Sequence, residues 1–94
     1  MCIQLDEIGY FSAEQNYCRC HLKDESIHLI RVNIGNLEEE LDEYEFLRTH
    51  RGYLVNLNEV NTVNVHQRLC RVGETSIPVS RRKLPRVRQA VRER

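Results

Sequence analysis

Apolar and polar residues alternate over the first third of the chain, and this period of two is typical of half-buried β-strands. The alternation predicts strands over residues 3–11, 17–22 and 26–32, separated by a polar loop at 12–16 and a short turn at 23–25. The pattern slips by one position at Asp6 and Glu7. Because such a slip moves the apolar side chains to the other face, we expect a bulge or a short turn there.

The middle of the chain changes to helical spacing. Leu37, Leu41 and Tyr44 recur at three- and four-residue intervals, and most residues between them are acidic. Asn36 is a good N-cap, and Glu39 follows it three residues later, as in a capping box. An amphipathic acidic helix is therefore predicted over residues 37–46, with its apolar side on the core and its acidic side in solvent.

Short apolar runs return in the second half. Extended chain is expected at 46–50, an irregular turn with a short strand or helical turn at 51–58, and strands at 60–65, 69–72 and 75–79. A closing helix is predicted over residues 80–91. Pro85 leaves two alternatives open, because proline inside a helix removes a hydrogen bond and clashes with the preceding turn. Either the helix begins at the N-cap Ser80 and is interrupted, or it begins near Pro85 after a turn over residues 80–83.

These elements predict a mainly β fold: a small antiparallel arrangement of about seven short strands, with one central amphipathic helix and a C-terminal helix. Sequential hairpins favour antiparallel pairing. A chain of 94 residues has room for one small core, and no linker or repeat divides it. We therefore predict a single domain over residues 1–94.

The net charge is zero, but the two halves differ strongly. Residues 1–47 hold three basic and eleven acidic residues, a net of −8, whereas residues 48–94 hold eleven basic and three acidic residues, a net of +8. One part of the surface can therefore face a polyanion while another repels it. Charge alone leaves open the alternative of two solvated helices that differ in sign.

The four cysteines, Cys2, Cys18, Cys20 and Cys70, lack the spacing of a zinc site. Structural zinc sites usually contain Cys-x2–4-Cys and a second ligand pair, whereas Cys18 and Cys20 are one residue apart and no second pair follows. On a strand these two side chains share a face, so we interpret them as reduced, buried thiols. Metal binding or a disulfide is the alternative; we predict no metal and no cofactor.

Several classes of protein receive no support from the sequence. No apolar run approaches the roughly 18 residues that span a bilayer, and the first residues do not resemble a signal peptide. We therefore expect a cytoplasmic protein without membrane insertion. No nucleophile elbow, glycine-rich phosphate loop or His-Glu-x-x-His motif is present, which argues against an enzyme.

Candidate nucleic-acid contacts gather where predicted elements end, in residues 15–17, 50–52 and 80–82. Arginine presents a planar fork of donors that matches guanine or phosphate, and asparagine can pair with adenine. Each candidate also has a structural alternative. Tyr17 can pack in the core, His50 can hold the chain in place, and Arg51 and Arg81 can be solvated or paired with the acidic helix. Asn56 and Ser80 are interpreted as turn and cap residues.

Two motifs resemble the paired signature of the LytTR family, which comprises DNA-binding output domains of bacterial response regulators. The first is Phe46-Leu47-Arg48-Thr49-His50-Arg51-Gly52-Tyr53-Leu54-Val55-Asn56, and the second is Ile77-Pro78-Val79-Ser80-Arg81-Arg82. The stretch from Asp6 to Tyr17 is similar to the opening strand and loop of the family. Gly52, where the family often has serine, and Pro85 depart from its pattern.

The resemblance implies a β-rich domain that inserts loops into successive major grooves of double-stranded DNA. The implied base contacts are Asn16, Tyr17, Arg51 and Arg81. The implied phosphate contacts are Arg48, His50, Arg82, Lys83 and Arg86. It also implies a homodimer on direct repeats in promoters, controlled by a receiver domain or by a separate regulatory protein.

Three rival functions are weaker. The acidic helix over residues 37–46 is a candidate docking face for another protein, with negligible DNA affinity. An RNA-binding sheet needs several exposed aromatic residues for base stacking, and this chain has four Tyr, two Phe and no Trp. A hydrolase requires a Ser, Cys or His on which activity depends.

Overall fold

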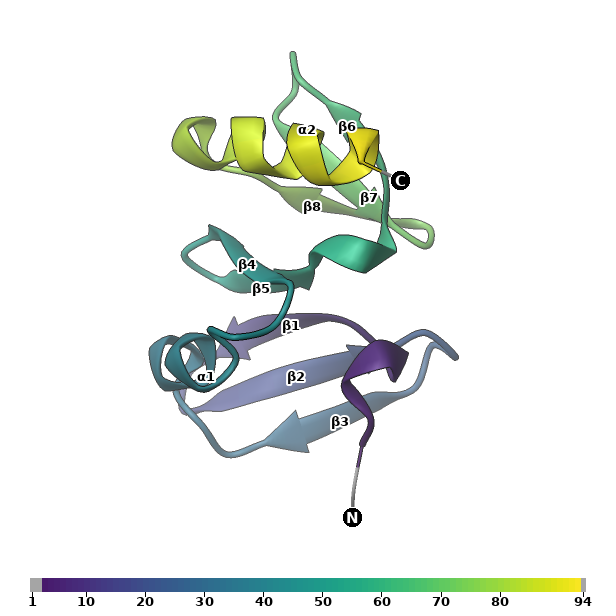
Figure 1. Ribbon diagram of the computed structural model, residues 1–94. Helices are drawn as coiled ribbons and strands as arrows, with labels where there is room; N and C mark the ends of the chain where they lie inside the picture. Colours follow the sequence, from purple (N-terminus) through teal and green to yellow (C-terminus); the bar gives the residue numbers. More distant parts are fainter. Residues whose placement is uncertain (1–2, 94) are drawn as a thin grey trace.

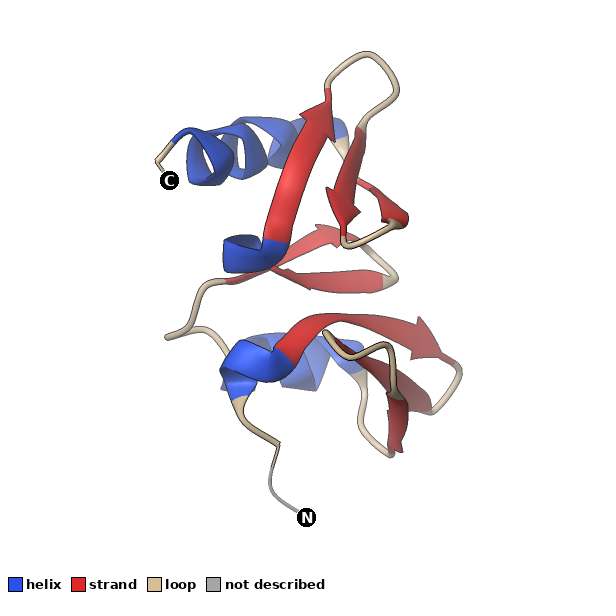
Figure 2. Ribbon diagram, turned by 90° about the vertical axis from the view of Figure 1, so that its right-hand side faces the viewer, coloured by secondary structure: helices blue, strands red, loops and turns tan. Residues whose placement is uncertain are grey.

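Eight strands form two antiparallel sheets, which lie one above the other in Figures 1 and 2. The computed structural model describes residues 3–93. The first sheet has the order β3-β2-β1-β5-β4 and the second β6-β7-β8. The strands are β1 (Ile8–Glu14), β2 (Tyr17–Leu22), β3 (Ile27–Ile30), β4 (Phe46–His50), β5 (Tyr53–Asn56), β6 (Val60–Asn64), β7 (Leu69–Val72) and β8 (Thr75–Pro78). The helices are α1 (Ile34–Glu40) and α2 (Leu84–Arg92), and 3-10 turns span Leu5–Glu7 (η1), Leu57–Glu59 (η2) and Arg81–Lys83 (η3).

The central strand β5 joins two apolar clusters, because its two faces serve different cores. Leu54 packs with Phe11 of β1 and with the apolar side of α1, whereas the next residue, Val55, packs in the second cluster. That second cluster also contains Val60 of β6 and Val87 of α2. Both β5 side chains are fully buried. Each sheet therefore has its own helix, and β5 is the strand that holds the two halves together.

The antiparallel, mainly β prediction is confirmed, although several boundaries differ. Residues 5–7 form a 3-10 turn, and β1 then continues through Glu14. The loop predicted at 12–16 is therefore wrong for residues 12–14 and is a turn only at Gln15 and Asn16. The strand is longer because Ser12, Ala13 and Glu14 continue the hairpin ladder with β2, pairing with Arg19, Cys18 and Tyr17. On its other side β1 pairs with β5 as far as Ser12. A register shift between Ile8 and Tyr10 provides the expected irregularity just after Asp6 and Glu7.

The acidic helix begins earlier and is shorter than predicted. Asn33, rather than Asn36, is the N-cap of α1: its Oδ1 accepts hydrogen bonds from the N–H groups of Gly35 at 2.7 Å and Asn36 at 3.4 Å. The helix ends at Glu40, and residues 41–45 form turns. A helix over residues 37–46 is therefore wrong, because the chain must turn before Phe46 to enter β4 in line with β5.

The C-terminal segment settles the question about Pro85. The 3-10 turn η3 precedes α2, and Pro85 stands in the first turn of α2, where a missing N–H costs no intrahelical bond. The apolar side of the helix packs on the second sheet through Leu84 and Val87. Ser80 is the N-cap residue of η3, as predicted for its position, and its carbonyl accepts a hydrogen bond from the Lys83 N–H at 3.0 Å. Its side chain, however, makes no capping hydrogen bond.

The cysteines of the described residues are buried and unpaired. Cys18 and Cys20 lie side by side on the inner face of β2, as their spacing predicted, and Cys70 lies in the second cluster. Burial raises the pKa of Cys20 and of Cys70 to about 11, so both thiols are protonated at neutral pH. Cys2 lies outside the described residues.

Candidate nucleic-acid interface

Three turns that carry the candidate residues lie on the same side of the molecule, at the left of Figure 1. They are the β1–β2 turn (Gln15-Asn16), the β4–β5 turn (Arg51-Gly52) and η3 with the preceding Ser80. We refer to these three turns, with the adjoining Tyr17, as the loop edge. They are far apart in the sequence, so only the sheet topology brings them together.

Backbone hydrogen bonds link each of the second and third turns to a strand residue beside the preceding turn. The Ala13 N–H, near the end of β1, donates to the Gly52 carbonyl at 2.8 Å. The Ser80 N–H donates to the Thr49 carbonyl of β4 at 2.7 Å. Because main-chain bonds fix the turns relative to one another, the side chains that they carry are presented from a common, rigid support.

The first turn exposes both residues that were expected to contact bases. Asn16 is exposed, and 42 % of Tyr17 is exposed at the first position of β2. The alternative that Tyr17 packs in the core is therefore wrong. Beside the turn, Arg19 forms an ion pair with Glu14, and the hydrogen bond from Arg19 lowers the pKa of the Glu14 carboxyl.

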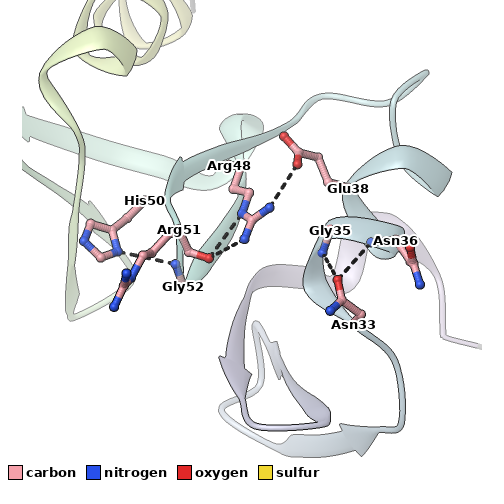
Figure 3. A network of polar contacts seen from close by, with 8 residues as sticks. All are labelled: Asn33, Gly35, Asn36, Glu38, Arg48, His50, Arg51 and Gly52. Carbon is pink, nitrogen blue, oxygen red and sulfur yellow. Dashed lines mark hydrogen bonds and ion pairs between the residues drawn. The ribbon is translucent and has the colours of Figure 1, made fainter.

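Arg48 supports the second turn from the side that faces α1 (Figure 3). Its Nε and Nη2 donate to the Arg51 carbonyl at 3.2 and 2.6 Å, and its Nη1 donates to Glu38 of α1 at 3.3 Å. The Arg51 side chain points away from Glu38 in the same view. Arg48 therefore connects the acidic helix with the turn that presents Arg51.

His50 also takes part in the geometry of this turn. Its Nδ1 accepts a hydrogen bond from the Gly52 N–H at 3.4 Å, and its ring meets the edge of Tyr53 at 6.1 Å between centroids. These contacts match the interpretation of His50 as a residue that holds the chain in place. Its exposed ring nevertheless remains open to solvent on the loop edge.

The third turn supplies unpaired positive charge. Arg81 and Arg82 are exposed and Lys83 is half-buried. Over residues 3–93 no carboxylate lies within ion-pair distance of these three side chains or of Arg51. Arg86, one turn further along α2, does have such a partner, since its Nη2 donates to Glu45 at 2.9 Å.

The structure adds Arg68, a residue that the sequence analysis did not select. Its carbonyl accepts a hydrogen bond from the Val79 N–H at 2.9 Å, immediately before Ser80, and its side chain is exposed. Arg68 adopts a positive φ of 54° in the turn between β6 and β7. No sequence pattern singles out an arginine in a surface turn, so only the contact with the third turn reveals it.

The arrangement suits recognition of a polyanion. Guanidinium groups at separate turns can pair with phosphate or with the major-groove edge of guanine, and the exposed Asn16 and Tyr17 add adaptable contacts. Within residues 3–93 no group of three His, Cys, Asp or Glu side chains is placed to hold a metal ion. None of the helices in that range is long and apolar enough to cross a membrane.

Comparison with known proteins agrees with this site. The family model of the LytTr DNA-binding domain matches residues 1–92. The sensory transduction protein LytT of Oceanobacillus iheyensis is 29% identical to this chain over 87 residues, which cover 86% of this chain. The chain spans only 35% of that relative's length. A solved LytTr DNA-binding domain from Bacillus cereus has the same fold, with a TM-score of 0.79 at 19% identity over 97% of this chain and 86% of that one. The chain belongs to the LytTr DNA-binding domain family.

Proposed function

We propose that this chain regulates transcription by sequence-specific binding of double-stranded DNA, with the loop edge inserted into successive major grooves. The observation that carries the proposal is the set of main-chain bonds that hold three exposed turns on one side of the protein. A rigid support is what recognition of bases requires, since each side chain must meet its base edge without a large ordering cost.

The residues divide into two groups by the chemistry that each can perform. Arg51 and Arg81 have free guanidinium groups at the tips of their turns, so we assign them to base contacts. Asn16 and Tyr17 reach a neighbouring groove. The assigned phosphate contacts, which fix the register of the protein on DNA, are His50, Arg82, Lys83, Arg48 and Arg86.

Arg48 and Arg86 differ from the others in this second group. Each already has a carboxylate partner, Glu38 or Glu45, and both pairs are partly exposed. Exposed ion pairs contribute little, about 0–1 kcal/mol, so a phosphate can replace or share either carboxylate at small cost. Contact of Arg48 and Arg86 with DNA is thus compatible with their positions in the free protein.

The proposal extends to the context in which the domain acts. We propose that residues 1–94 form one DNA-binding domain, that two copies occupy direct repeats in promoters, and that a receiver domain or a separate regulatory protein supplies the signal. The name of the Oceanobacillus relative describes sensory transduction, and that relative is longer than this chain. The family is one of DNA-binding domains rather than enzymes. We also propose a cytoplasmic location, where the chain has access to the genome.

Selection of random double-stranded DNA on the purified chain tests the proposal. The test variant is the Arg51→Ala, Arg81→Ala double substitution. The matched control is the Arg71→Ala, Arg88→Ala double substitution, which removes the same charge from two exposed arginines outside the loop edge. We expect an enriched motif of two half-sites about one helical turn apart, 10–10.5 base pairs, with the wild type and the control.

The double substitution Arg51→Ala, Arg81→Ala should abolish enrichment, since each lost bidentate base contact costs about 1–3 kcal/mol. Enrichment that survives this substitution would retain DNA binding but refute the assignment of these two residues. Absence of any motif, with weak and salt-sensitive binding only, would favour the protein-docking function of the acidic segment.

A further inference from the structure

One outer edge of the first sheet is a strand with exposed apolar side chains, and no strand within residues 3–93 pairs with its free side. Strand β3 is the last in the sheet order, so only β2 pairs with it among the described strands. Ile27 is 50% exposed and Leu29 is 64% exposed. Among the described residues, no other large apolar side chain is as exposed as Leu29. Proteins usually protect such edges with lysine, proline or a bulge, and residues 27–30 contain none of these.

The free hydrogen-bonding groups of this edge belong to the same two residues. The Leu22 N–H donates to the Ser26 carbonyl at 2.9 Å, so this pair is of the hydrogen-bonded type. Antiparallel pairs alternate, and therefore His28 and Ile30 also direct their main-chain groups toward β2. The N–H and C=O groups of Ile27 and Leu29 consequently point away from the sheet.

We propose that β3 pairs with β3 of a second copy of this chain, antiparallel and about a two-fold axis at His28. This register sets Ile27 of each copy opposite Leu29 of the other, and these are the residues whose main-chain groups are free. Each such pair forms two N–H···O=C bonds, while the apolar side chains of the two copies cover one another. The result is a continuous ten-stranded sheet, twice the five strands of the single copy.

Charge at the ends of the strand selects this partner and this register. Acidic residues, Asp24 and Glu25, precede β3, and the basic Arg31 follows it. Antiparallel pairing about His28 sets Glu25 of one copy opposite Arg31 of the other, twice per dimer. A two-fold axis at Ile27 would instead set Leu29 opposite Glu25, and an axis at Leu29 would set Ile27 opposite Arg31. Either register would lose the match of charges. The strand is thus complementary to itself, as an interface between identical copies must be.

Pairing through β3 has a consequence for DNA, which rests on the function proposed above. Ile30 is the partner of Cys18 next to Tyr17, so β3 runs toward the loop edge. The second copy runs in the opposite direction, and its loop edge faces the opposite way. Such a dimer therefore holds two separate DNA segments together, unlike two copies that lie side by side on adjacent repeats.

Sedimentation velocity of the full 94-residue chain without DNA tests the pairing directly. A four-residue edge makes a small, weak interface, so we expect conversion from monomer to dimer over roughly the micromolar to millimolar range. Leu29→Lys should weaken dimerisation at least tenfold, because it sets a charge on the apolar contact. Tyr44→Lys is the matched control, since Tyr44 is 52% exposed on another surface, and it should dimerise as the wild type does.

Charge reversal makes the test independent of folding defects. Glu25→Arg and Arg31→Glu should each weaken the dimer by opposing like charges, and the two substitutions combined should restore it. A chain that remains monomeric, variants that dimerise as the wild type does, or single losses without recovery in the double variant would each overturn the proposal.

Capture of a second DNA duplex by an immobilised one then tests the consequence. Wild type should join the duplexes and Leu29→Lys should not, while binding of Leu29→Lys to one duplex stays unchanged. Dimerisation without any DNA binding would instead refute the proposed function and leave the β3 interface intact.

Discussion

At the scale of single residues, Thr49 carries a buried polar group that is unfavourable for stability. It is fully buried in β4, and its Oγ1 has no hydrogen-bond partner among the described residues. A buried hydroxyl without a partner costs about 1–3 kcal/mol. We expect Thr49→Val, which keeps the shape and removes the hydroxyl, to raise the free energy of unfolding by about 1 kcal/mol in urea denaturation. The control is Thr62→Val, at an exposed position of β6, which should change the free energy of unfolding by less than about 0.5 kcal/mol. If Thr49→Val instead destabilises the protein, the Thr49 hydroxyl has a hydrogen-bond partner and the prediction is wrong.

His21 gives the stability of the protein a dependence on pH. Its ring stacks on Tyr10 at 4.0 Å and its Nε2 lies 2.9 Å from the Ser12 hydroxyl. Burial, and then the nearby Arg19 guanidinium, lower the pKa of His21 below its ordinary value of 6.5. Between the folded pKa and 6.5 the unfolded chain binds more protons, so the free energy of unfolding falls as the pH drops through that window.

Urea denaturation at pH 7.5 and again below pH 6.5 measures how much the free energy of unfolding falls between the two conditions. This fall should be smaller for His21→Gln than for the wild type. His66→Gln is the control, because His66 is exposed in a turn, and it should keep the dependence of the wild type. Equal pH dependence in wild type and His21→Gln would show that other groups are responsible.

At the scale of elements, the start of α1 distinguishes the observed cap from the predicted one. The Asn33 side chain accepts two main-chain hydrogen bonds, whereas Asn36 only donates through its own N–H. Replacement of an asparagine cap by alanine costs about 1 kcal/mol. We expect Asn33→Ala to lower the free energy of unfolding by about that amount and Asn36→Ala to change it by less than about 0.5 kcal/mol. A larger loss of stability in Asn36→Ala than in Asn33→Ala would instead support a capping box between Asn36 and Glu39.

The elements also show which parts of the fold are visible in the sequence. Alternation of apolar residues identified β2, β7 and β8 almost to their ends, because both flanking turns are local features. The end of β1 differs from the prediction because Ser12, Ala13 and Glu14 pair with β2 through main-chain groups, which requires no apolar alternation. The pairing of β1 with β5 joins segments far apart in the sequence and also leaves no local pattern. Asn36 was selected as a cap because Glu39 completes a familiar spacing, although the chain was already helical by Ile34.

The candidate site was predictable only in part, for a similar reason. The two arginine-containing motifs identified Arg51 and Arg81, but composition and spacing could not show that the Thr49 and Ser80 main chains are bonded to each other. The supporting role of Arg48 depends on the Arg51 carbonyl, a main-chain group with no sequence signal. Side-chain identity can thus be inferred from the sequence, whereas the support beneath those side chains comes from the tertiary structure.

At the scale of the whole molecule, the separation of charge determines how DNA binding depends on salt. A net charge of zero predicts little long-range attraction, yet counterion release depends on the number of phosphates contacted, not on net charge. Each phosphate contact steepens the slope of log K against log salt concentration by about 0.9. We therefore expect a clearly negative slope for the wild type, and a slope about 1.8 shallower for the Arg82→Gln, Lys83→Gln double variant, measured by fluorescence anisotropy.

Two controls make this measurement specific to the loop edge. Arg71→Gln, Arg88→Gln removes the same charge from exposed positions elsewhere and should keep the wild-type slope. Arg51→Gln should reduce discrimination between the selected site and an unrelated sequence, because base contacts carry the specificity while phosphate contacts carry the salt dependence. If the slope of log K against log salt concentration changes in all three variants in proportion to the charge removed, then the attraction depends on overall charge and not on position. The assignment of Arg82 and Lys83 to phosphate contacts would then fail.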